Sequence, residues 1–241
     1  MSHVSKAYGG VQALRDVSLE VDAGERVALI GPNGAGKTTC FNVLNGQLAP
    51  DAGEVRLDGV SLAGLAPHEI ARRGVGRTFQ VAALFASMTV RENLQMALLA
   101  RRGLQRSLLG SAARCCRAEA EALLERVALA EDAARPCAAL AYGALKRLEL
   151  ALALAQAPRV LLMDEPTAGL AAAERAELMA LASGLARSEN IAVLFTEHDM
   201  DVVFGFASRV LVLHLGELIA GGAPEAVRAD ARVREVYLGD A

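Results

Sequence analysis

"GPNGAGKTT", residues 31–39, is the most informative stretch of this chain. The stretch follows a short apolar run and opens a helical pattern, and it satisfies the spacing G-x-x-x-x-G-K-[ST] of a phosphate-binding loop. Gly31, Gly34 and Gly36 let the backbone curl, so that its N–H groups point inward at a polyphosphate. The helix that follows adds a partial positive charge at its N-terminus.

The last letters of the loop carry the side chains for phosphate and metal. Lys37 supplies a full charge to the β- and γ-phosphates of a nucleotide, and the Thr38 hydroxyl can ligate Mg²⁺. A glycine-rich turn without a ligand is the alternative, but the required strand–loop–helix context argues against it. The residues predicted to bind nucleotide here are Gly31, Pro32, Asn33, Gly34, Ala35, Gly36, Lys37, Thr38 and Thr39.

A second segment, "VLLMDE" (160–165), supplies the acids that such a site needs. Four apolar residues bring Asp164 and Glu165 to the end of a buried strand. Asp164 can hold Mg²⁺ through the water shell of the metal, and Glu165 is then placed to orient or deprotonate the attacking water. A plain solvated turn is the alternative, which the phosphate loop disfavours because its positive charge needs a metal and a base nearby.

Strand and helix patterns alternate along both ends of the chain. Short apolar runs fit strands buried on both faces, whereas alternating runs fit half-exposed strands. The predicted buried strands are 26–31, 159–166 and 191–198, the half-exposed strands 16–21 and 53–59, and the helices 37–46, 174–187 and 199–206. This order predicts an α/β fold that binds its ligand at the carboxyl ends of parallel strands.

The middle of the chain, about residues 89–157, shows no strand pattern and predicts an all-helical insertion. Its best helical face holds Cys116, Ala120, Leu123, Leu124 and Val127. The basic stretch "RRGLQRSLLGSAAR" (101–114) is either a loop that faces a partner or a solvated connection between helices. The second interpretation is favoured, because isolated charge runs are usually surface.

Composition limits the classes of function. The 241 residues are 53% hydrophobic and 22% charged, which is typical of a folded globular chain. The net charge of −3 lacks the excess of positive charge that is typical of nucleic-acid-binding proteins. No stretch approaches the roughly 20 apolar residues that a membrane span needs. The four cysteines form no CxxC pair, which favours free thiols in a reducing compartment. We therefore expect a soluble, cytosolic protein that meets a membrane only through a partner.

Taken together and in this order, the motifs resemble those of the ATP-binding subunits of ABC transporters, over essentially all 241 residues. The resemblance implies one domain: a P-loop ATPase core with an antiparallel β subdomain and the inserted helical subdomain. It also implies three further site residues. Tyr8 in "KAYGG" would stack on adenine. Gln80 in "GRTFQ" would reach Mg²⁺ and the attacking water and move with the transport subunit, and His198 in "FTEHDMD" would contact the γ-phosphate and position the water.

Longer stretches narrow the subfamily. Three stretches resemble the ATPases of branched-chain amino-acid uptake systems, namely residues 74–94, 197–213 and 233–240. The ATPases of urea and short-amide importers share much of the same sequence. The resemblance implies ATP and Mg²⁺ as cofactors and a dimer of two ATPase chains, identical or different. That dimer would lie on the cytoplasmic side of the inner membrane, beneath two permease subunits. An extracytoplasmic binding protein would deliver the substrate to these permease subunits.

In such dimers each ATP also meets a Leu-Ser-Gly-Gly-Gln-type motif of the other chain, which "LAYGAL" (140–145) matches through Tyr142 and Gly143. Ala141 stands where the family has serine, and Leu145 stands where glutamine is usual. Ala171 occupies the place of an Asp or Asn that reaches across the dimer. We therefore hypothesise that this chain keeps a complete catalytic half, with all the residues that act on its own nucleotide. The half that it offers to the partner's nucleotide is reduced, because these polar side chains are missing.

Two other functions remain open at this point. The first is an ABC ATPase that serves another machine, such as lipid or polysaccharide export. The second is a regulatory subunit that binds nucleotide and hydrolyses little because of Ala141 and Ala171. The intact Glu165 and His198 argue against the second, since a module that only binds has no need of a positioned base.

Overall fold

The computed structural model describes residues 1–78, 84–103 and 116–238. Its main sheet has six strands in the order β11-β10-β3-β9-β8-β7. Five of them run parallel, and β11 at the edge is antiparallel to β10. The strands are β3 (Arg26–Ile30), β7 (Val75–Thr78), β8 (Val160–Asp164), β9 (Ala192–Thr196), β10 (Arg209–His214) and β11 (Glu217–Gly222).

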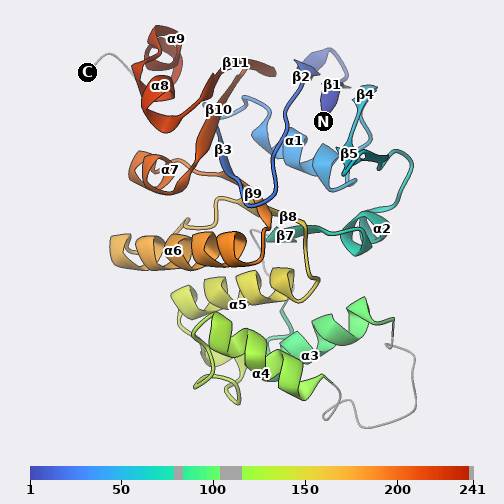
Figure 1. Ribbon diagram of the computed structural model, residues 1–241, viewed down its shortest axis with the longest axis vertical. Coiled ribbons are helices and arrows are strands. Elements are labelled where there is room, and N and C mark those ends of the chain that lie inside the picture. The colour runs from blue at the N-terminus through green and yellow to red at the C-terminus, as the bar shows by residue number, and fades with distance from the viewer. Residues whose placement is uncertain (79–83, 104–115, 239–241) are drawn as a thin grey trace.

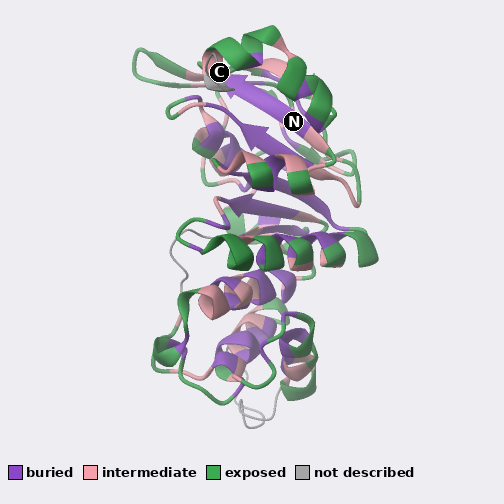
Figure 2. Cartoon of the chain, turned by 90° about the vertical axis from the view of Figure 1, so that its left-hand side faces the viewer, coloured by how far each residue is buried: buried purple, intermediate pink, exposed green. Residues whose placement is uncertain are grey.

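The three strands predicted as buried correspond to β3, β8 and β9 in the middle of this sheet. Every residue of β9 is buried, because helices cover both faces of the sheet (Figure 2). Strands β7 and β10, which complete the parallel order, are not among the predicted strands. The parallel register places Asp164 at the end of β8 beside Thr196 at the end of β9. The carboxyl ends of the strands therefore meet at one edge, as the α/β pattern predicts.

A second, antiparallel sheet forms from β1 (Ser2–Tyr8), β2 (Val11–Val17) and β4 (Ala52–Glu54) in the order β2-β1-β4. The predicted strand 16–21 has wrong bounds, because the ladder ends at Val17. Asp16 has a positive φ of 51°, which interrupts the pleat at that point. The alternation beyond it marks burial instead, since Leu19 is buried between the exposed Ser18 and Glu20. The predicted strand 53–59 is divided between β4 and β5 (Arg56–Leu57), which pairs with β6 (Val60–Ser61).

Helices cover the sheet as two separate layers. On one face α1 packs through Cys40 and Phe41 against Leu29, Leu162 and Leu194. The other face contacts α6 and α7, and neighbouring strand residues point to opposite sides, as the period of two requires. The helices around the sheet are α1 (Lys37–Leu44), α2 (Pro67–Arg72), α6 (Ala172–Ser188), α7 (Met200–Phe206), α8 (Pro224–Ala229), α9 (Ala231–Val233) and the π-helix η2 (Arg234–Leu238).

A group of helices forms the end of the molecule opposite the antiparallel sheet (Figure 1). It contains α3 (Val90–Arg101), α4 (Arg117–Arg126), the short 3₁₀ helix η1 (Cys137–Ala139) and α5 (Tyr142–Leu154). Thr89 begins α3 with a capping box, in which its Oγ1 accepts from the Glu92 amide at 3.2 Å. The predicted apolar face of α4 is buried at Ala120, Leu123 and Leu124.

Within the described residues this helical part contains no strand, apart from one bridge between Thr89 and Pro136. It therefore matches the inserted helical subdomain of the predicted fold class, although most of the basic stretch 101–114 lies outside the described residues. None of the helices that the structure describes has both the length and the apolar character to cross a membrane.

Candidate nucleotide site

The phosphate loop connects β3 to α1, and its glycines are sterically required. Gly36 precedes the helix with a φ of 109°, a conformation that side chains disfavour. A Cβ atom on Gly36 would lie 2.4 Å from the Ala13 carbonyl oxygen, and one on Gly31 would lie 2.0 Å from the Leu213 carbonyl oxygen. The loop is thus fixed between β2 and β10, with the N-terminus of α1 open behind it.

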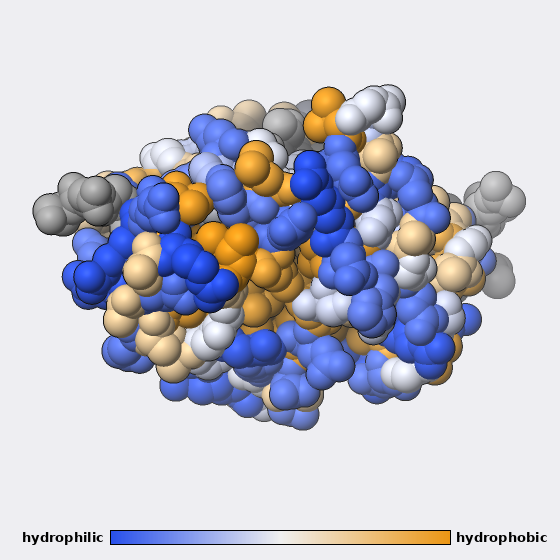
Figure 3. Space-filling model, turned by 90° about the horizontal axis from the view of Figure 1, so that it is seen from above, coloured by the Kyte–Doolittle hydropathy of each residue, from blue (hydrophilic) through white to orange (hydrophobic). Residues whose placement is uncertain are grey.

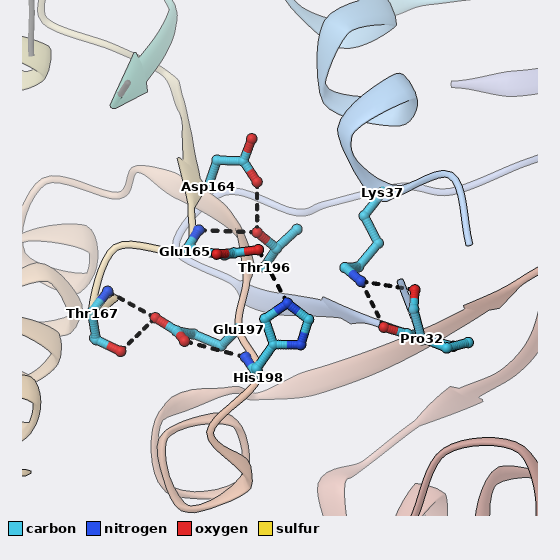
Figure 4. Close-up of polar contacts among 9 residues, drawn as sticks. Pro32, Lys37, Asp164, Glu165, Thr167, Thr196, Glu197 and His198 are labelled. Atoms are coloured by element: carbon cyan, nitrogen blue, oxygen red, sulfur yellow. Dashed lines mark hydrogen bonds and ion pairs between the residues drawn. The ribbon is translucent and has the colours of Figure 1, made fainter. Parts of the chain in front are cut away.

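Lys37 is the buried cation of this loop, with 8% of its surface exposed. Its Nζ donates to the carbonyl oxygens of Gly31 at 2.6 Å and Pro32 at 3.1 Å (Figure 4). Burial lowers the pKa of Lys37, while the charges of Glu165 and Asp164 act in the opposite direction. An ammonium has three donors, so one remains for a phosphate oxygen.

The remaining loop residues differ in exposure. Asn33, Gly34 and Thr38 are exposed, Pro32, Gly36 and Thr39 are intermediate, and Ala35 is buried. The structure gives the Thr38 hydroxyl no hydrogen bond to the described residues, which leaves its oxygen available to a ligand. Ala35 instead holds the loop, because its carbonyl oxygen accepts from Gly216 N at 3.0 Å.

Asp164 is the first of the two acids, at the buried end of β8. Its Oδ1 accepts from Thr196 Oγ1 at 2.8 Å, and its Oδ2 accepts from Arg77 Nη2 at 2.9 Å. The Arg77 side chain, on β7, also donates to Asn42 Oδ1 at 2.7 Å and Gln47 Oε1 at 3.0 Å, next to α1. Arg77 therefore joins the strand that carries Asp164 to the helix that carries Lys37. Sequence reasoning missed it, although it lies in the quoted motif "GRTFQ".

Glu165 follows at a sharp turn, with a φ of 48°. Its amide is held by Thr196, through Oγ1 at 3.0 Å and the carbonyl oxygen at 3.2 Å. The turn directs the carboxylate toward the loop after β9, where Oε1 lies 3.1 Å from Nε2 of His198. Figure 4 shows both side chains across from Lys37. The structure thus brings together Lys37, Asp164, Glu165 and His198, as the sequence predicted for one site.

Glu197 is a third acid at this edge, and it is not among the residues predicted from the sequence. It is 4% exposed, and its Oε1 accepts from the Thr167 amide at 2.8 Å and the Thr167 hydroxyl at 2.6 Å. Its Oε2 accepts from the His198 amide at 3.3 Å. The only sequence signal is a charged residue at the end of the apolar run 191–198, where a solvated turn is the simpler expectation.

Tyr8 lies at the end of β1, is 50% exposed and is paired with the exposed Val11 of β2. The turn between β10 and β11, which carries the exposed Leu215, is bonded to β2 and to the phosphate loop, since Gly216 accepts from Arg15 N and donates to the Ala35 carbonyl oxygen. Figure 3 shows an apolar area, bordered by hydrophilic side chains, at this end of the molecule. Gln80, predicted to reach the metal and the water, lies outside the described residues.

The predicted partner-facing residues Tyr142 and Gly143 begin α5, apart from the cluster around Lys37. Tyr142 is 49% exposed, and Nζ of the buried Lys146 lies 5.5 Å from its ring centroid. A Cβ on Gly143 would lie 2.8 Å from Oε1 of Glu174, so the glycine lets α5 approach α6. Counted from Leu140, the fifth place of the motif is Ala144 and the sixth is Leu145. Neither carries an amide side chain.

Both alanines noted as departures are helix N-caps. Ala141 precedes α5 and Ala171 precedes α6, each with an extended backbone and no side-chain capping bond. At Ala171 only the reciprocal bond exists, in which the amide donates to Glu174 Oε2 at 3.0 Å. Serine, aspartate or asparagine at these positions would cap the helix. Both helices therefore begin without a side-chain acceptor for their first N–H groups.

A glycine-bounded phosphate loop after the buried strand β3, two acids at the end of β8 in the same sheet and a histidine against the second acid define the class. The chain is a P-loop nucleotide hydrolase. A family model described as "ABC transporter" matches residues 14–168, and one described as "Branched-chain amino acid ATP-binding cassette transporter" matches residues 217–241. The chain belongs to the ABC transporter family, as an ATP-hydrolysing, ATP-binding subunit.

Relatives match along the whole chain. The chain is 42% identical to the high-affinity branched-chain amino acid transport ATP-binding protein BraF of Pseudomonas aeruginosa, over 100% of this chain and 97% of BraF. It is 43% identical to LivG of Escherichia coli K12, which carries the same description, over 97% of this chain and 94% of LivG. It is 34% identical to the lipopolysaccharide export system ATP-binding protein LptB of Haemophilus influenzae, over 99% and 95% of the two chains.

Solved structures show the same architecture. The ADP conformation of the ATP-binding cassette MJ1267 superposes with a TM-score of 0.88 at 30% identity, and covers 99% of this chain and 97% of that one. The cassette MJ0796, described as a dimer bound to ADP and phosphate, gives a TM-score of 0.78 at 28% identity, over 92% and 97% of the two chains. These comparisons confirm the predicted family, fold class and ATPase activity.

Proposed function

We propose that this chain powers an importer of branched-chain amino acids. In this proposal it is one half of an ATPase dimer on the cytoplasmic side of the inner membrane, beneath two permease subunits, with substrate delivered by an extracytoplasmic binding protein. The observation that carries the substrate class is the match of residues 217–241 to the branched-chain amino-acid family model. Two relatives with the corresponding name, at 42% and 43% identity, support it.

In the hydrolysis step, we assign the attack on the γ-phosphate to a water held by Glu165 and His198. The oxygen of this water bonds to the γ-phosphorus while the bond from that phosphorus to the β,γ-bridging oxygen breaks, and ADP leaves. Glu165 Oε1 and His198 Nε2 are 3.1 Å apart, so one water can meet both groups. A carboxylate in this place accepts the proton of the water while the imidazole holds the transferred phosphoryl group. Lys37 and the N–H groups of the loop take up the charge that develops on the phosphate oxygens.

We propose that the site binds Mg²⁺. The protein residues that would hold the ion are Thr38, Asp164 and Gln80. The donor set fits the ion, because Mg²⁺ prefers hydroxyl and carboxylate oxygens and keeps several waters. Both Asp164 oxygens already accept one bond, from Thr196 and Arg77, which favours contact through a metal-bound water. When bound, the ion neutralises charge on the β- and γ-phosphates. The described residues offer no cluster of three His, Cys, Asp or Glu, in keeping with a metal held mainly by nucleotide and water.

The partner's nucleotide would meet the first turn of α5. Gly143 and the backbone N–H groups that follow Ala141 form a helix N-terminus, which attracts anions without a side-chain cap. Ala141 lacks the hydroxyl that a serine would add, and a hydrogen bond to a charged phosphate is worth about tenfold to a hundredfold in affinity. The half offered to the partner would therefore be weaker than the half built on Lys37.

A cleft of about 310 Å³ is the surface we assign to the permease. It lies between the α/β core and the helical part, lined from one side by Asn45, Ala71 and Arg77 and from the other by Leu152 and Gln156. Its walls are mainly apolar, as expected of a docking site. The strand β7 that borders it ends at Thr78, two residues before Gln80 in the sequence, whose predicted role is to move with the transport subunit.

The test is reconstitution with the membrane subunits encoded by neighbouring reading frames. We expect ATP-dependent uptake of leucine, isoleucine or valine into vesicles, stimulated by the matching binding protein. Uptake of urea or short amides instead would correct the substrate class. The second candidate is export, which the relationship to LptB at 34% identity supports. Copurification with export permeases, and no uptake of any amino acid, would establish it.

A further inference from the structure

Glu197 is a carboxylate buried at the edge of the site, where a charge is expensive. It is 4% exposed, and the structure pairs it with no lysine or arginine among the described residues. Removing an ionised carboxylate from water is unfavourable unless other groups compensate it. A buried charge of this kind needs a structural reason.

Within the described part of the chain, the groups that donate to Glu197 lie on two loops. The Thr167 amide and hydroxyl donate to Oε1 at 2.8 and 2.6 Å, and the His198 amide donates to Oε2 at 3.3 Å (Figure 4). Three donors of this kind satisfy the oxygens of the buried carboxylate. One side chain thus ties the loop after β8 to the loop after β9.

These two loops carry the pair assigned to the attacking water. Thr167 comes two residues after Glu165, and His198 is the residue next to Glu197. The Glu165 amide is fixed separately by Thr196. With Thr167 fixed by Glu197, the turn at Glu165 is held at both ends, so that its carboxylate has one direction toward His198.

We propose that Glu197 is a positioning residue for ATP hydrolysis. Its carboxylate sets the distance between Glu165 and His198 by holding both loops, and it does not itself touch the nucleotide. The proposal rests on the roles assigned above to Glu165 and His198. It contrasts with the simpler alternative, in which Glu197 only stabilises the fold.

The sharpest variant is Glu197→Gln, which keeps the shape and removes one acceptor. With the amide nitrogen facing His198, two N–H donors oppose each other. With the amide reversed, the Thr167 N–H loses its acceptor and the Thr167 hydroxyl can only accept. We expect kcat to fall by about tenfold to a hundredfold, since a bond to a charged group is involved, while KM for ATP changes less than about twofold. Thr167→Val removes only the hydroxyl bond and should give a smaller loss. Glu189→Gln, on an exposed residue, is the control.

A second readout separates positioning from stability. The C2 proton of His198, identified by its loss in His198→Ala, is followed by NMR through a pH titration of the full chain. Displacement from Glu165 alters the field at the imidazole, so we expect Glu197→Gln and Thr167→Val to move this titration, and Glu189→Gln to leave it unchanged.

The outcomes decide between the two roles. A lower kcat with an unchanged KM and a shifted His198 titration supports the proposal. A wild-type kcat in Glu197→Gln, or a reduced kcat with an unmoved titration, overturns it. If Glu197→Gln does not fold, Thr167→Val distinguishes the two roles by the same two measurements. An inactive wild-type chain would contradict the proposed function, whereas the titration would still test the position of His198.

Discussion

Nε2 of His198 lies 3.1 Å from Oε1 of Glu165, at the carboxyl ends of the neighbouring strands β9 and β8. Their side chains are 46% and 30% exposed, so a water can reach both groups. This pair, with Lys37 opposite, is the geometry on which the mechanism depends.

Replacing His198 with alanine should lower kcat by about 100-fold, because removing one side chain that holds the phosphoryl group in the transition state costs about 10² to 10³. ATP affinity, measured with a fluorescent analogue, should change little, since Lys37 and the loop remain. His68→Ala, at an exposed position on α2, is the matched control. Turnover by His198→Ala within about threefold of wild type would remove His198 from the reaction.

The ion pair between Arg77 and Asp164 should be costly to break. The two side chains are 10% and 6% exposed, so Arg77→Leu leaves a buried carboxylate without its cation. We expect the free energy of unfolding to fall by about 3–5 kcal/mol in urea denaturation. Arg56→Leu breaks the pair with Glu54, whose side chains are 55% and 38% exposed, and should cost less than about 1 kcal/mol. Equal losses in both variants would show that the buried pair has no special weight.

Ala141→Ser should act in two separable ways. A serine N-cap on α5 should raise the free energy of unfolding by about 1 kcal/mol, and its hydroxyl can also bond the partner's γ-phosphate. Ala66→Ser adds a cap to α2, which does not carry the partner-facing motif, and is the control for stability alone. Both variants should be more stable, and only Ala141→Ser should hydrolyse ATP faster. Unchanged turnover in Ala141→Ser would contradict the reduced-half hypothesis.

The same variant distinguishes the two forms of dimer. In a homodimer both composite sites gain the hydroxyl, so the whole activity should rise. In a heterodimer only the site on the partner's phosphate loop gains it, and the activity that depends on Lys37 of this chain should stay constant. Steady-state ATPase of the isolated chain and of the mixed complex measures this difference.

Stability should depend on pH through Cys40. Burial raises the pKa of the Cys40 thiol to about 12 in the folded chain, whereas an unfolded cysteine ionises near about 8.5. Between these values the unfolded chain loses a proton that the folded chain keeps. The free energy of unfolding should therefore fall with rising pH, by up to about 1.4 kcal/mol per unit for this group.

Urea denaturation between about pH 7 and 10 tests this dependence. Cys40→Ala should show a shallower decline than wild type, and Cys116→Ala, at a partly exposed thiol, should follow the wild-type slope. Parallel curves for wild type and Cys40→Ala would show that this thiol does not control the alkaline loss of stability.

Much of the site could be predicted because its parts obey strong local constraints. The backbone around Gly36 admits no Cβ, so the glycine spacing is visible in the letters alone. The apolar run before Asp164 marks a buried strand for the same reason that it is buried in the structure. Motif and context together predicted Lys37, Asp164 and Glu165, the family resemblance added His198, and the structure brings these four side chains together.

Other features have no comparable local signal. Arg77 and Glu197 are charged residues near the ends of short apolar strands, where the expected place is the surface, and only tertiary contacts make them buried partners. The predicted strand 16–21 extends beyond the true end of β2, because the burial of Leu19 continues the alternating pattern. The positive φ of Asp16 marks where the ladder ends, and the pattern of apolar residues does not reveal it. Strand β7 is too short for its periodicity to identify it.

A complete catalytic half on this chain depends on Glu165, and Glu165→Gln removes the base while it keeps the shape of the side chain. Turnover and ATP affinity should be measured for wild type and variant, alone and in complex with the copurifying subunits. We predict that Glu165→Gln binds ATP with a Kd within a few-fold of wild type, while hydrolysis falls by at least about 100-fold. Hydrolysis by Glu165→Gln at the wild-type rate would show that the catalytic half does not work through this residue.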